Sequence, residues 1–338
     1  TVLIATTILK KTEEPSTKVF KDNRPVLAVP TSTFDSDKIL GMFDDPEEPG
    51  SIEILKNTKK IVCQPFNNGP RQGKIIYFPE TSVGAIGNVE KHTILAKGKV
   101  VVADPSAFTL IISNQTGPTA LHYPEIYEKI PPGLVYELHL NQTPIMQKVA
   151  DEEEERRTIV KGFSQVLKIA KSWKGLTKLT FTNLDQKALD DCNWQDGYKE
   201  VLQLKINGMT TFDENAHKYK ALLQRLQYFS PVECGPMDKT LSILVQSGKL
   251  RTLLIEGDSV TANTCAILAK QRDFASLGLR HIKLDINLAR ELAKLKNVRS
   301  LEFGRIDFEY PAVKELVSTT KADQVVFDEN IFTAPQLN

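Results

Sequence analysis

Cysteine is scarce in this chain of 338 residues: the four cysteines, Cys63, Cys192, Cys234 and Cys265, lie far apart and form no Cys-x-x-Cys pair. Their spacing excludes a disulfide scaffold and a cysteine-rich zinc module. An excess of one charge is also lacking, since 43 Lys and Arg oppose 42 Asp and Glu for a net charge of +1. No global field therefore attracts nucleic acid, and we expect no nucleic-acid partner. No apolar run approaches the ~20 residues that a membrane helix needs.

Motifs of catalysis and of cofactor binding are missing as well. The five histidines never fall at i, i+4 spacing, and no Gly-x-Ser-x-Gly nucleophile motif occurs. The stretch Gly69–Ile75 has three residues between its glycines and an isoleucine after its lysine, which fits a β-hairpin turn better than a phosphate loop. We therefore predict no metal, no cofactor and no enzymatic activity.

The first hundred residues contain short β-like runs separated by turn residues. The acidic, Pro- and Gly-containing stretch 44–50 is typical of a linker, because its like charges repel and its prolines interrupt regular structure. The segments 93–96 and 99–103 around Lys97-Gly98 predict a hairpin. We interpret residues 1–104 as a β-rich N-terminal cap domain that covers the end of the domain that follows.

The first nine residues, Thr1–Leu9, leave two alternatives open. They are the end of a membrane span or processed signal, stopped by Lys10-Lys11, or they form an edge β-strand, since Val, Ile and Thr favour extended structure. The first alternative implies a membrane tether before Thr1 and a location outside the cytoplasm.

Residues 105–338 show an internal periodicity. Apolar triplets of the form Leu-x-x-Leu-x-Leu recur, mostly about two dozen residues apart, and between them the apolar spacing changes from 2 to about 3.6. Each unit is therefore predicted to be a short strand followed by a helix, and stacked units would share one core. The long gap before residue 176 predicts an inserted helix, which would begin at the acidic run 151–155. The triplets are Leu176/Leu179/Phe181, Val201/Leu204/Ile206, Leu226/Phe229/Pro231, Leu250/Leu253/Ile255, Leu279/Ile282/Leu284, Val298/Leu301/Phe303 and Ala322/Val325/Phe327.

The segments Leu138–Ile145, Leu253–Val260 and Leu301–Phe308 resemble the Leu-x-Leu-x-x-Asn/Thr-x-Ile core of leucine-rich repeat proteins. The helix-containing units are most similar to the longer, ribonuclease-inhibitor-like kind. The array departs from the family pattern, because its characteristic asparagine or cysteine is mostly replaced. The resemblance implies an α/β solenoid with a parallel concave sheet and convex helices over residues 105–338.

Side chains that alternate with the buried triplet positions would line the concave sheet. We expect this surface to bind a protein or peptide, without catalysis; this step is an analogy, because fold does not fix function. An extracytoplasmic ligand-sensing domain and a hydrolase with a site near Asn67–Lys74 and His92 are the alternatives. The expected binding residues are His139, Lys178, Lys205, Tyr228, Glu256, His281, Lys283, Asp285, Glu302 and Asp328.

Overall fold

The computed structural model describes residues 7–10, 51–68, 71–88, 92–102, 108–143, 152–257, 260–271 and 273–328. The chain divides into two mixed α/β units, Val19–Glu200 and Val201–Asn338, the second of which also includes Thr1–Lys18. We call them the 19–200 unit and the 201–338 unit. The predicted linker at 44–50 and the predicted boundary between residues 104 and 105 fall outside the described residues.

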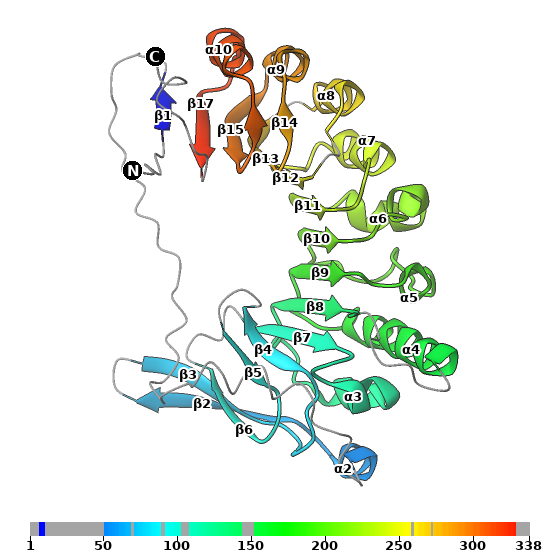
Figure 1. Ribbon diagram of the computed structural model, residues 1–338. Coiled ribbons are helices and arrows are strands. Elements are labelled where there is room, and N and C mark those ends of the chain that lie inside the picture. Colours follow the sequence, from blue (N-terminus) through cyan, green and yellow to red (C-terminus); the bar gives the residue numbers. More distant parts are fainter. Residues whose placement is uncertain are drawn as a thin grey trace. The chain divides into compact units, whose positions relative to one another are not determined.

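The 201–338 unit is built on a parallel sheet whose strands follow one another in chain order (Figure 1). A short antiparallel strand, β1 (Thr7–Lys10), pairs with the last of them. The edge-strand interpretation therefore holds for these four residues, whereas Thr1–Thr6 lie outside the described part of the chain. The parallel strands are β10 (Gln203–Asn207), β11 (Tyr228–Val232), β12 (Thr252–Glu256), β13 (Phe274–Arg280), β15 (Val298–Gly304) and β17 (Gln324–Asp328).

The register of this sheet has a constant period. Strands β10, β11, β12, β13, β15 and β17 align so that one residue of each forms a row across the sheet. Successive members of the row are 25, 24, 24, 24 and 24 residues apart, so each chain segment of this length adds one strand to the sheet. The row consists of Gln203, Tyr228, Thr252, Ser276, Ser300 and Gln324.

Helical segments connect the strands and cover one face of this sheet (Figure 1). Apolar strand residues face them because side chains alternate between the two faces of a strand. The fully buried row consists of Leu204, Phe229, Leu253, Leu277, Leu301 and Val325. The helical segments are η3 (Asp213–Tyr219), α6 (Lys220–Leu223), α7 (Asp238–Ser247), α8 (Ala262–Leu268), α9 (Ile286–Ala293) and α10 (Tyr310–Thr319).

The predicted register of one repeat is wrong. The strand there is β13, whose buried residues are Phe274, Leu277 and Leu279, rather than a strand carrying the triplet Leu279/Ile282/Leu284. The shared residue Leu279 fits both triplets, but Leu284 lies in a separate short strand, β14 (Lys283–Leu284), which pairs with β16 (Asp307–Phe308). The corrected start at Phe274 is 24 residues after Leu250 and 24 before Val298.

The 19–200 unit contains a second sheet. Strands β7 (Thr109–Ser113), β8 (Glu137–Asn141) and β9 (Lys178–Thr182) are parallel, and β4 (Ala85–Asn88) and β5 (His92–Leu95) extend the sheet in antiparallel orientation. The predicted inserted helix is confirmed as α4 (Glu152–Ala170), which lies between β8 and β9 in the sequence. The other helical segments are α2 (Ser51–Asn57), α3 (Pro118–His122), η2 (Pro124–Lys129) and α5 (Gln186–Asp190).

A small antiparallel sheet of β2 (Val62–Asn68), β3 (Arg71–Tyr77) and β6 (Lys99–Val102) completes this unit. The pairing of β2 with β3 confirms the hairpin predicted around Gly69–Ile75. The hairpin predicted around Lys97-Gly98 is wrong, because β5 pairs with β4 and β6 pairs with β3. The backbone of Gly98 instead bonds Phe78 and Pro79, so the chain passes from one sheet to the other there.

The described residues contain no helix that is both long and apolar enough to cross a membrane.

Candidate binding face

The face of the 201–338 sheet opposite its helices carries three rows of side chains, and we call it the open face. The row from Gln203 to Gln324 is the first. Two and four residues further along each strand, the same alignment gives a second and a third row. The second row is Lys205, Ser230, Leu254, Gly278, Glu302 and Val326, and the third is Asn207, Val232, Glu256, Arg280, Gly304 and Asp328.

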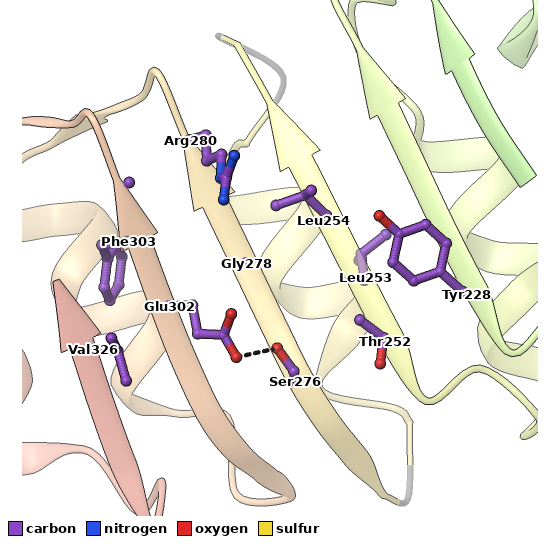
Figure 2. Close-up of a pocket in the computed structure, with 11 residues that line it drawn as sticks. Tyr228, Thr252, Leu253, Leu254, Ser276, Gly278, Arg280, Glu302, Phe303 and Val326 are labelled. Atoms are coloured by element: carbon purple, nitrogen blue, oxygen red, sulfur yellow. Dashed lines mark hydrogen bonds between the residues drawn. The ribbon is translucent and has the colours of Figure 1, made fainter. Parts of the chain in front are cut away.

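A hollow of about 190 Å³ lies on the open face, centred on Gly278 (Figure 2). We call it the Gly278 hollow. It crosses β11, β12, β13, β15 and β17, so residues about 100 positions apart in the sequence form it together. It is lined by Tyr228, Thr252, Leu253, Leu254, Ser276, Gly278, Arg280, Glu302, Phe303, Gly304 and Val326.

Two glycines shape this hollow by leaving side-chain positions vacant in neighbouring rows. Leu254 leans over the first, since its Cδ1 lies 2.6 Å from the place that a Cβ of Gly278 would take. Arg280 leans over the second, with its Cγ and Nε 3.2 and 3.3 Å from the Cβ position of Gly304. Larger residues would push both side chains upward and fill the hollow, so its shape depends on glycine at both positions.

Two opposite charges border the Gly278 hollow. The Oε1 atom of Glu302 accepts hydrogen bonds from the hydroxyls of Ser276 at 2.7 Å and Ser300 at 3.1 Å. These bonds hold the carboxylate on the face (Figure 2). The side chain of Arg280 is exposed, and within the described part of the chain no acidic group lies within ion-pair distance of it. A bound partner can therefore reach one negative and one positive group here.

The structure brings together some of the sequence-predicted binding residues and separates others. Lys205, Tyr228 and Glu302 lie on the open face, with Tyr228 and Glu302 at the hollow. Glu256 lies in the third row, where its carboxylate is 3.4 Å from the Nε2 atom of His281. Asp328 ends β17, and its side chain lies outside the described part of the structure.

Three other predicted residues do not lie in these rows, because the register of their repeat is wrong. His281 follows β13 with a positive φ of 51°, and Lys283 lies in the separate strand β14. Asp285 caps the N-terminus of α9, where its Oδ1 accepts a hydrogen bond from the backbone N–H of Leu288 at 2.8 Å. The sequence analysis missed Gly278 and Arg280 for the same reason; an even 24-residue spacing was the signal that could have found them.

The remaining two predicted residues belong to the 19–200 unit, where they form hydrogen-bonded polar contacts. Lys178 donates from Nζ to Oε2 of Glu137 at 3.0 Å, and Thr180 donates to Oε1 of the same carboxylate at 2.7 Å. His139 is only 5% exposed, and its Nε2 lies 3.0 Å from the hydroxyl of Thr182. These contacts engage both predicted side chains within the unit.

The cysteine thiols are held in their neutral forms. Burial raises the pKa of Cys192 and of Cys265 to about 12, and it also raises the pKa values of Cys63 and Cys234. A nucleophilic cysteine needs a lowered pKa, because the thiolate is the reactive form. The described residues also contain no cluster of His, Cys, Asp and Glu side chains that could hold a metal ion. The alternative hydrolase site depends on His92 and residues near Asn67, whose side chains lie outside the described part.

A second hollow, of about 570 Å³, lies on the helix side of the 201–338 unit between α7 and α8. Val245, Ile267 and Lys270 line it together with the end of α7. It has one charged side chain and no opposite charge among its lining residues, so it offers less for specific recognition than the Gly278 hollow does.

No family model matches the chain, and no curated protein matches it.

Proposed function

We propose that this protein is a non-enzymatic recognition module that binds a peptide or a protein segment on the open face of its 201–338 unit. The observation that carries the proposal is the Gly278 hollow, which combines an aromatic ring, apolar side chains and two opposite charges on a helix-free face. Tyr228 supplies the ring, and tyrosine is enriched at the energetic centres of protein interfaces. Neither the partner nor the binding itself follows from the fold alone.

The size of the hollow favours a polypeptide over a small metabolite. Pockets for drug-sized ligands measure about 300–1,000 Å³ and enclose most of the ligand. At about 190 Å³, the Gly278 hollow has room for an anchoring side chain but not for a ligand that must find all its contacts inside. A peptide can place one or two side chains in the hollow and gain further contact from the rows of the open face.

We also propose that the 201–338 unit is a repeat array of the leucine-rich repeat kind. Its strand-and-helix segments of 24 or 25 residues support this proposal, because each segment buries its apolar row against its neighbours. Such arrays use their sheet face for binding, which agrees with the proposed position of the partner.

A peptide selection tests the proposed function. A random-peptide library is selected on the full chain, on Gly278→Val and on Ala275→Val; the two variants introduce the same residue into the same strand, but Ala275 does not line the hollow. We expect the wild type and Ala275→Val to retain the same peptides, and Gly278→Val to bind them at least about tenfold more weakly. Failure to select any peptide, or equal binding by Gly278→Val, would refute the proposal.

A further inference from the structure

Arg280 and Glu302 stand at a spacing that an extended peptide can match. Glu302 is the cross-strand partner of Gly278, two residues before Arg280 on the neighbouring strand. With about 4.8 Å between strands and about 3.3 Å per residue, the two Cα atoms are roughly 8 Å apart. Side chains at positions i and i+2 of an extended peptide point the same way and are about 6.6 Å apart. Two such side chains can therefore reach both groups at once.

The two charges are available for a partner. Both side chains are exposed, and they do not form an ion pair with each other. Glu302 uses Oε1 for its two serine hydroxyls, and no hydrogen bond to its Oε2 is found among the described residues. Arg280 lies over Gly304 with its stem held against the sheet, so its guanidinium is positioned without being neutralised.

The floor between these charges is apolar and low. Leu254 and Val326 border it, and Gly278 contributes no side chain. The aliphatic stem of a lysine or arginine can cover such a floor while its charged end reaches a carboxylate. A short acidic side chain fits beside Arg280, where a guanidinium can donate two parallel hydrogen bonds to a carboxylate.

We propose that the Gly278 hollow selects extended peptide segments in which an acidic residue and a basic residue are two positions apart, with the acid at Arg280 and the base at Glu302. This inference rests on the proposed function and specifies its partner. Matching both signs gives specificity, because a peptide with either charge reversed would place like charges together.

A charge-swap experiment on a peptide array tests this inference. The array holds matched peptides with Asp-x-Lys, Lys-x-Asp, Asn-x-Gln and Asp-x-Asp in identical Ser/Tyr flanks. It is probed with the wild-type full chain, Arg280→Glu, Glu302→Lys and the double variant. Lys321→Glu serves as the control, since this exposed lysine does not line the hollow. Far-UV circular dichroism verifies that every variant is folded.

We expect one of the two mixed-charge orders to bind the wild type about five- to tenfold more tightly than Asn-x-Gln, which is the range for a partly exposed pair of charge contacts. Each single reversal should abolish this preference, and the double variant should restore it for the opposite order. The control should behave as the wild type. Equal binding of the neutral peptide, or a double variant without restored binding, would overturn the inference.

The two proposals can fail separately. If the random library yields peptides that need Gly278 but show no paired charges, the proposed function stands and the charge rule is wrong. If it yields no peptide whose binding depends on the hollow, both are wrong.

Discussion

Two adjacent leucines of β12 face opposite sides of the sheet, and replacing each by alanine tests the arrangement of the 201–338 unit. Leu253 is 0% exposed in the row that faces the helices, whereas Leu254 is half-buried on the open face. The two substitutions remove the same atoms from neighbouring positions of one strand. Any difference in their effects therefore reports the environment of each side chain.

The expected magnitudes follow from burial. Leu253→Ala removes a fully buried side chain and leaves a cavity, which lowers the free energy of unfolding by about 3 kcal/mol within a usual range of about 2–5 kcal/mol. Leu254→Ala loses only part of the transfer free energy and leaves no enclosed cavity, so it should cost less than about 1 kcal/mol. A volume-conserving Leu253→Ile change should cost less than about 1.5 kcal/mol.

Urea unfolding followed by far-UV circular dichroism measures these changes. Both tryptophans, Trp173 and Trp194, belong to the 19–200 unit, so their fluorescence reports that unit alone. A shift in the dichroism transition therefore contains the response of the 201–338 unit. If Leu254→Ala costs as much as Leu253→Ala or more, the strand faces the opposite way and the open face is wrongly assigned, because a one-residue slip exchanges the two faces.

Three further changes test other contacts. Asp213→Ala removes the carboxylate that accepts the N–H groups of two first-turn residues of α7, at 3.2 and 2.7 Å, and should lower the free energy of unfolding by about 1 kcal/mol in the same urea assay. Glu137→Ala leaves Lys178 without its 3.0 Å partner and should cost about 1–3 kcal/mol, while an unchanged midpoint would show that the contact is not formed. Between their unfolded pKa of 9.0 and their folded pKa of about 12, Cys192 and Cys265 bind more protons in the folded state, so the free energy of unfolding should fall as pH rises above 9, as urea titrations at pH 8 and 10 would measure. Both thiols should also react slowly with iodoacetamide at pH 8 in the folded protein, and fast labelling would contradict the raised pKa values.

The alternation of strands and helices in residues 201–338 was predictable because each element has a strong apolar period. Triplets such as Leu250/Leu253/Ile255 are buried as expected, and the helical spacing correctly indicated α7 and α10. The register of β13 was not predictable from the triplet alone. Leu279 and Leu284 are both buried, and the extra strand β14 continues the apolar pattern beyond the end of β13.

The site was harder to predict than the fold for two physical reasons. The Gly278 hollow results from missing side chains, and a glycine has no hydrophobic signal that a periodic pattern could reveal. The pairing of β5 and β6 with different partners depends on backbone hydrogen bonds of Gly98 to distant residues, which local turn signals do not specify. Tyr228 and Glu302 were identified correctly because their own strands had the right register.

Methyl NMR of the full chain with a selected peptide tests the central claim most directly. Leu254 and Val326 line the Gly278 hollow, and their sequence neighbours Leu253 and Val325 are buried in the row that faces the helices. Binding on the open face should shift the methyl signals of Leu254 and Val326 strongly and those of their neighbours weakly. Shifts concentrated instead on Val245 and other residues of the hollow between α7 and α8, with Leu254 and Val326 unchanged, would contradict it.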